Sequence, residues 1–167
     1  AGSWTIYRFG HTTTGHMNGP PIKGGQGLES DKMSREATKI HFDSYAKKII
    51  EKMRPLVGDN FYNLELDSYE AGKQNWTPKF REEFKSRRGY DPLQWLPVLA
   101  GCILESPDQT ARFGRDIEKT ISDLYIENHY QYLAELSNEQ GVRMDYEAYG
   151  GPFDPLAAGG AADMPMG

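Results

Sequence analysis

The 167-residue sequence contains a single cysteine, Cys102, so neither an intrachain disulfide nor a metal site built from cysteines can form. No apolar run is long enough to cross a membrane, and no signal-peptide pattern is present. No basic run is longer than Arg87-Arg88, and the formal net charge is -5. We therefore expect no nucleic-acid partner and no membrane-spanning segment, in a chain that is either cytosolic or already processed.

The composition is that of a globular domain rather than a disordered chain, with 38% hydrophobic and 26% charged residues. Aromatic residues make up 12%, including ten tyrosines and three tryptophans. Sugar-binding sites favour such side chains because a flat ring covers the C–H face of a sugar. Aromatic residues also fill ordinary cores, so composition alone is only a hint of carbohydrate binding.

Hydrophobic patterning predicts three short buried strands separated by helices. The strands are expected at residues 4–9, 61–66 and 142–146, and the helices at residues 34–53, 78–88 and 107–140. Ser34, Thr77 and Ser106 are suitable N-caps, while Gly89 and Gly141 are suitable helix ends. Residues 157–167 show no helix or strand pattern, and the chain looks cut rather than finished there.

The alternation of strands and helices predicts an α/β fold with a parallel sheet. An open doubly wound sheet and a (β/α)₈ barrel both fit this order. Because a barrel needs eight strands, the three predicted here would supply less than half of one.

In parallel α/β folds, ligands bind at the carboxyl ends of the strands, so the loops after the predicted strands are the places to search. Glu70 follows the second strand and Glu147 the third, and hydrolysis of a glycosidic bond needs two such carboxyl groups. Asp67 and Asp154 are alternative candidates for these two carboxyl groups. Each acid taken alone is more often a solvated loop carboxylate than a catalytic group.

Other polar and aromatic side chains follow the same strands. His11, His16 and His129 do not match a standard zinc spacing, so contact with sugar hydroxyls is more plausible for them than a transition-metal site. Trp76 and Trp95 could stack on sugars, although Trp95 is expected to pack in the core.

Several ordered stretches resemble family 106 glycoside hydrolases, the α-L-rhamnosidases, and the resemblance covers nearly the whole chain. The resembling stretches are residues 7–15, 27–32, 67–72, 75–77, 87–92, 127–130, 149–152 and 163–165. The resemblance implies that residues 1–167 are part of a TIM-barrel catalytic domain, a partial (β/α)₈ barrel of about three strand–helix units. The rest of the enzyme is then expected to lie beyond both ends.

The family resemblance also implies an activity, namely release of terminal α-L-rhamnose from plant glycans by an inverting, calcium-dependent enzyme. Glu70 matches the family's acidic position and is assigned as general acid. Glu147 is the available base, although the family's base could lie beyond residue 167, and Asp67 is a candidate calcium ligand. The expected substrate contacts are His11, Thr12, Asp67, Asn75, Trp76, His129 and Tyr149.

Alternative interpretations remain open at this point. A barrel glycosidase could act on another sugar, as a β-galactosidase-like hydrolase does, and a non-catalytic carbohydrate-binding domain could keep the cleft but lack one acid. The resemblance favours a periplasmic or secreted location. The isolated chain is expected to be inactive or poorly folded, because an incomplete barrel exposes sheet edges and needs the rest of the polypeptide as its partner.

Overall fold

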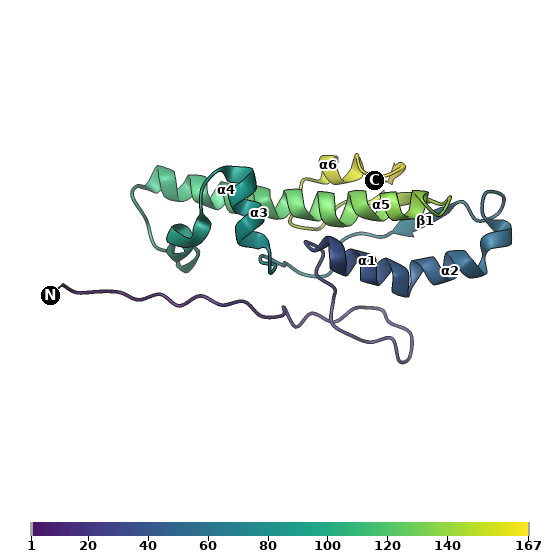
Figure 1. Cartoon of the computed structure of the whole chain (residues 1–167), viewed down its shortest axis with the longest axis horizontal. Coiled ribbons are helices and arrows are strands. Elements are labelled where there is room, and N and C mark those ends of the chain that lie inside the picture. The colour runs from purple at the N-terminus through teal and green to yellow at the C-terminus, as the bar shows by residue number, and fades with distance from the viewer. Residues whose placement is uncertain (1, 167) are drawn as a thin grey trace. The chain divides into compact units, whose positions relative to one another are not determined.

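A computed structural model describes residues 2–166 (Figure 1). The chain divides into two compact units: a first unit of Ala1–Thr13 and Pro78–Thr120, and a second unit of Thr14–Thr77 and Ile121–Gly167. The elements in chain order are α1 (Arg35–Ser44), α2 (Ala46–Lys52), the 3₁₀ helix η1 (Arg54–Leu56), β1 (Asn63–Leu66), α3 (Phe80–Arg88), the 3₁₀ helix η2 (Pro92–Ala100), α4 (Pro107–Tyr125), the π-helix η3 (Ile126–Tyr130), α5 (Gln131–Asn138), β2 (Arg143–Glu147), α6 (Pro155–Gly159) and β3 (Met164–Met166).

The second unit contains a parallel sheet of three strands in the order β1-β2-β3. In its register Leu66 of β1 lies opposite Tyr146 of β2, and Glu147 of β2 lies opposite Met166 of β3. Two strands predicted from the sequence are thus confirmed, as is the α/β class with parallel pairing. The carboxyl ends of β1 and β2 lie side by side, which sets where a site would form.

Two predictions about the ends of the chain are wrong. Residues 4–9 form no strand, and Trp4 and Ile6 are 88% and 90% exposed. An aromatic-rich run satisfies the pattern of a strand, but a strand also needs a pairing partner, and within residues 2–166 this run has none. Conversely, α6 and β3 occupy a region expected to lack regular structure, because β3 forms by pairing with β2 rather than from a local pattern.

Two of the three predicted N-caps, Ser34 and Ser106, are confirmed, whereas Thr77 does not cap a helix and not every predicted boundary holds. Ser34 Oγ accepts from the N–H of Ala37 (3.2 Å) and Ser106 Oγ accepts from the N–H of Gln109 (3.2 Å). The first predicted helix is interrupted at Tyr45, whose backbone (φ -128°, ψ -75°) is not helical. The second begins at Phe80 after Lys79, which provides no side-chain cap, and Thr77 Oγ1 donates to Asp31 (2.6 Å).

The long predicted helix contains the π-turn η3 between α4 and α5. A π-turn contains one residue more than a turn of α-helix, so it changes which side chains of the helix face inward. Ile126, His129 and Tyr130 of η3 are all buried. No helix within residues 2–166 has the length and hydrophobicity needed to span a membrane.

An aromatic cluster forms the core of the second unit beneath the strand ends. The Phe153 ring lies 5.9 Å from Tyr69, 5.9 Å from Tyr125 and 4.9 Å from Tyr130, measured between ring centroids. The hydroxyls of Tyr69 and Tyr125 are hydrogen-bonded at 2.9 Å. Tyr69 follows β1 and Phe153 follows β2, so the cluster anchors both strand-end loops on the helix behind them.

Candidate functional site

The loops that follow β1 and β2 are joined directly to each other. The backbone N–H of Tyr69 donates to the carbonyl of Tyr149 at 2.9 Å. Gly150 makes this close approach possible: its φ is +87°, and a Cβ placed there would lie 2.5 Å from the carbonyl oxygen of Tyr69. The two loops therefore present their side chains next to one another.

Three carboxylates and a tyrosine gather at these loops, and we call Asp67, Glu70, Glu147 and Tyr149 the strand-end cluster. Tyr149 donates its hydroxyl proton to Glu147 Oε2 (2.7 Å), and this hydrogen bond raises the pKa of Tyr149 above its usual value. Ser68 links the other two acids, because its N–H donates to Asp67 Oδ1 (2.7 Å) and its hydroxyl donates to Glu70 Oε1 (3.4 Å).

The strand-end cluster is accessible and acidic. Asp67, Glu70 and Tyr149 are exposed, and Glu147 is half-buried. Within residues 2–166 none of the three carboxylates forms an ion pair with lysine, arginine or histidine. Carboxyl groups free of ion pairs can give or accept protons, which is the chemistry that acid–base hydrolysis needs.

A hydrogen-bonded network around Asp31 holds the segment that carries Asn75 and Trp76. Asp31 Oδ2 accepts from Thr77 Oγ1 (2.6 Å), and its Oδ1 accepts from the side-chain amide of Gln74. Asn75 itself is exposed and Trp76 is half-buried. The sequence analysis did not single out Asp31 as a site residue. The one signal for it was its position in a stretch, residues 27–32, that resembles the family.

Two expected substrate contacts, His11 and Thr12, belong to the first unit and are exposed. Their roles stay predictions.

Asp145, in β2, is buried; its Oδ2 accepts from the side-chain amide of Asn63, whereas its Oδ1 has no hydrogen-bond partner within residues 2–166.

His129, also an expected substrate contact, lies in the interior of the second unit and is only 5% exposed. Its Nδ1 lies 3.5 Å from Thr38 Oγ1 of α1. Burial lowers the pKa of His129 to about 3, assisted by the positive charge of Lys32 and by His41. The imidazole is therefore neutral at ordinary pH, and its contact with substrate stays a prediction.

The buried His129 makes stability depend on pH. Because its pKa is about 3 when folded and near 6.5 when unfolded, the unfolded chain binds more protons between these values, so the free energy of unfolding should fall as pH decreases from 6.5 towards 3. The slope can reach about 1.4 kcal/mol per pH unit. The free energy of unfolding, measured by denaturant titration at several pH values in this range, should change less with pH in His129→Gln than in wild type. The same pH dependence in both proteins would contradict this assignment.

Calcium is the cofactor expected from the family resemblance, and the described residues do not by themselves fit such a site. Within residues 2–166 no three or more His, Cys, Asp or Glu side chains come together so as to hold a metal ion. Calcium takes about six to eight oxygen ligands, so Asp67 could be one ligand only if other parts of the polypeptide supplied the rest.

Comparison with known proteins assigns this arrangement to a class. A parallel α/β sheet with carboxyl groups at the ends of neighbouring strands is an arrangement found in glycoside hydrolases. The family model described as alpha-L-rhamnosidase matches residues 1–167, so the chain belongs to that family of glycoside hydrolases.

Two relatives show how much of a longer protein the chain represents. It is 42% identical over 165 residues to a protein of Formosa agariphila named "Putative beta-glucuronidase", covering 99% of this chain and 14% of that protein. It also resembles the structure of a rhamnosidase from Novosphingobium sp. PP1Y, with a TM-score of 0.80 and 33% identity, covering 89% of this chain and 15% of that one. The chain thus spans about a seventh of the length of these relatives.

Proposed function

We propose that the chain is part of the catalytic domain of a glycoside hydrolase that releases terminal α-L-rhamnose from plant glycans with inversion. The observation that carries this proposal is the position of Glu70 and Glu147 at the carboxyl ends of two strands that pair in parallel, in a chain that matches the rhamnosidase family throughout. The rest of the polypeptide is proposed to complete a (β/α)₈ barrel, to which this chain gives about three strand–helix units.

Glu70 is the proposed general acid. A general acid must reach the oxygen of the leaving group, and the exposed carboxyl of Glu70 is open to a bound substrate. Its hydrogen bond from Ser68 is long at 3.4 Å, so it leaves the carboxyl able to turn towards a substrate.

Glu147 is the proposed general base within this chain. In an inverting enzyme the two carboxyls stand about 6.5–9.5 Å apart, so that a water molecule fits between the base and the sugar. Tyr149 holds the Glu147 carboxyl through a single hydrogen bond to one oxygen, which leaves the other to accept a proton from water. A carboxylate beyond residue 167 is the competing candidate for this role.

The name of the Formosa relative favours a second candidate activity, hydrolysis of a β-glucuronide. A glucuronide carries a carboxylate, which the three acids of the strand-end cluster would repel, because none of them is ion-paired with a basic side chain of residues 2–166. Rhamnose is a neutral 6-deoxy sugar and meets no such repulsion. The negative charge of the strand-end cluster therefore supports the rhamnoside over the glucuronide at this site.

The test is a substrate screen of the full-length protein. We expect hydrolysis of an aryl α-L-rhamnoside and at least a hundredfold lower kcat/KM for the aryl β-D-glucuronide. Calcium dependence is part of the proposal, so EDTA should abolish rhamnoside hydrolysis and added calcium should restore it. Full activity after chelation would remove calcium from the proposal. A preference for the glucuronide would establish the second candidate, and the absence of any hydrolysis would favour a carbohydrate-binding domain.

The proposal also includes two expectations about the chain's setting. The family membership supports a periplasmic or secreted location, because polymeric glycans are degraded outside the cytoplasm. The 167 residues expressed alone are expected to lack activity, since the sheet formed within residues 2–166 has three strands and leaves its edges unpaired.

A further inference from the structure

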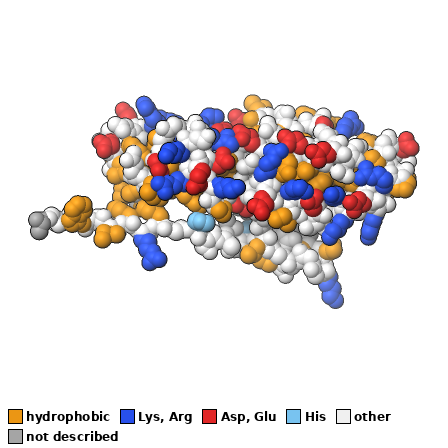
Figure 2. Space-filling view, viewed as in Figure 1, with side chains coloured by type: hydrophobic (Ala, Val, Ile, Leu, Met, Phe, Trp, Pro, Cys, Tyr) orange, Lys and Arg blue, Asp and Glu red, His pale blue; other side chains and the backbone are white. Residues whose placement is uncertain are grey.

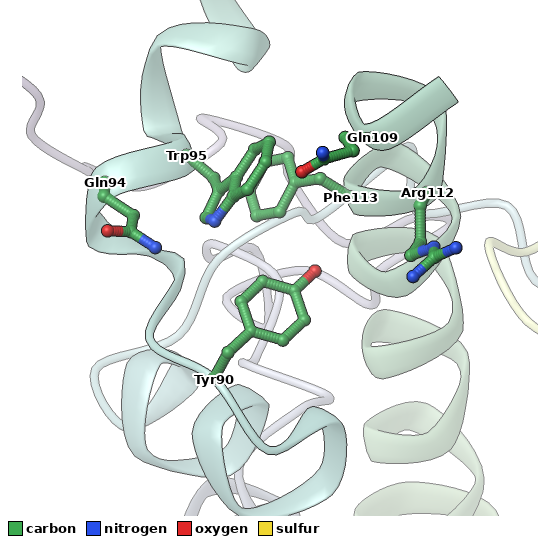
Figure 3. A pocket seen from close by; sticks show the side chains of 6 residues that line it. All are labelled: Tyr90, Gln94, Trp95, Gln109, Arg112 and Phe113. Atoms are coloured by element: carbon green, nitrogen blue, oxygen red, sulfur yellow. The ribbon is translucent and has the colours of Figure 1, made fainter. Parts of the chain in front are cut away.

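The first unit contains a small pocket, and none of the residues that line it belongs to the strand-end cluster. The pocket is formed by the segment from Tyr90 to η2 on one side and by α4 on the other, with a volume of about 260 Å³ (Figure 3). Its lining residues are Tyr90, Gln94, Trp95, Gln109, Arg112 and Phe113. This volume is just below the roughly 300–1,000 Å³ of pockets for drug-sized ligands, so it suits a ligand about the size of one sugar ring.

The floor of the pocket is aromatic and held in place. Trp95 and Phe113 lie nearly parallel, with ring centroids 5.9 Å apart and an interplanar angle of 24°. Tyr90 meets Trp95 edge to face, and its hydroxyl donates to Asp116 Oδ2 at 2.8 Å. Phe113 is buried, whereas Trp95 and Tyr90 are half-buried. Part of the Trp95 ring is thus available to a ligand at low entropic cost.

The rim of the pocket is polar. The side chains of Gln94, Gln109 and Arg112 are exposed, and within residues 2–166 none of them forms a side-chain hydrogen bond or an ion pair, although the charge of Arg112 acts on Tyr90. Arg81 of the same unit, by contrast, forms two hydrogen bonds to Asp91 (2.9 and 2.7 Å). Figure 3 shows Gln109 and Arg112 extending from α4 on one side and Gln94 from η2 on the other.

We propose that this pocket is an accessory binding site for one pyranose ring of an acidic saccharide. The exposed part of Trp95 covers the apolar face of the sugar, and the two glutamine amides bond its hydroxyls. The Arg112 guanidinium bonds the carboxylate, because a free guanidinium matches a carboxylate in both charge and shape. The site would hold a glycan chain without cutting it, so it does not depend on the proposed activity.

The alternative occupant is a side chain from the rest of the polypeptide. Three unpartnered polar groups around an aromatic floor suit a polar, water-exchangeable ligand better than an apolar side chain, which would leave them without hydrogen bonds. This alternative is an outcome of the test rather than part of the proposal.

The test measures binding of two matched sugars to the full-length protein by saturation-transfer NMR. Methyl α-D-galacturonoside and methyl α-D-galactopyranoside differ only in the group at C6, and neither is a substrate considered above. We expect the acidic sugar to bind more tightly, and Arg112→Gln to raise its Kd roughly tenfold while leaving the Kd of the neutral sugar unchanged. The matched control is Arg115→Gln, another exposed arginine of α4 that does not line the pocket.

A second variant tests the sugar-ring contacts separately from charge. Gln94→Ala combined with Gln109→Ala changes two exposed side chains and should weaken both sugars alike. Equal effects of Arg112→Gln and Arg115→Gln would overturn the proposal, as would sugar binding that no pocket variant changes. Absence of binding in the wild type, which is expected if the polypeptide covers the pocket, would overturn it too. Because the readout is binding, these outcomes are independent of rhamnoside hydrolysis.

Discussion

Replacing Glu70 with glutamine should reduce turnover of an unactivated rhamnoside by about 10²–10⁴-fold, the usual contribution of general acid catalysis. Glutamine keeps the size of the side chain and can still accept the hydrogen bond from Ser68, so the loop should be retained. What it cannot do is give a proton to the departing oxygen. The measurement is kcat/KM of the full-length protein on a rhamnoside with a poor leaving group.

The leaving group separates a lost acid from a damaged site. An aryl rhamnoside whose phenol leaves without protonation should lose much less activity in Glu70→Gln, because the missing proton is no longer needed. Glu51→Gln is the matched control, since Glu51 is an exposed glutamate of α2 and lies outside the strand-end cluster. Equal losses on both substrates, or near-normal activity on the poor leaving group, would remove Glu70 from the acid role.

Most local features of this fold were predictable from the sequence, as was the parallel pairing of β1 with β2, whereas other tertiary features were not. Ser34 and Ser106 cap helices as predicted, because a cap is a contact between near neighbours in the chain. The strands at 63–66 and 143–147 also matched their patterns. The run at 4–9 has an equally good pattern but no partner strand within residues 2–166, whereas β3 has a poor pattern and a partner in β2.

The candidate site divides in the same way. The positions of Glu70 and Glu147 after two strands could be predicted, since parallel strands bring their carboxyl ends to one edge of a sheet. The hydrogen bond from Tyr149 to Glu147 and the network around Asp31 could not, because no sequence rule pairs residues 31 and 77. The sequence also did not indicate that His129, an expected substrate contact, lies buried in the π-turn; that contact stays a prediction.

The close contact at Gly150 leads to the second large expected effect. Gly150→Ala adds a Cβ 2.5 Å from the carbonyl oxygen of Tyr69, a distance that must grow to at least 3.0 Å, so one of the two strand-end loops has to move by about half an ångström. The moving segments carry Glu70 on one side and Tyr149, with its bond to Glu147, on the other. Misplacement by about 1 Å can cost roughly 10²-fold in rate, so we expect a loss approaching that size.

Gly58→Ala is the control that isolates the contact from backbone strain. Gly58 has a φ of +94° and Gly150 a φ of +87°, so an alanine is strained at both positions, by about 1–3 kcal/mol. Only Gly150 has another backbone in the way, since no atom lies within 4 Å of a Cβ at Gly58. If the strand-end loops act as one unit, Gly150→Ala should lose rhamnoside turnover while Gly58→Ala loses stability alone. Equal turnover in the two variants would mean that the spacing of these loops does not set the chemistry.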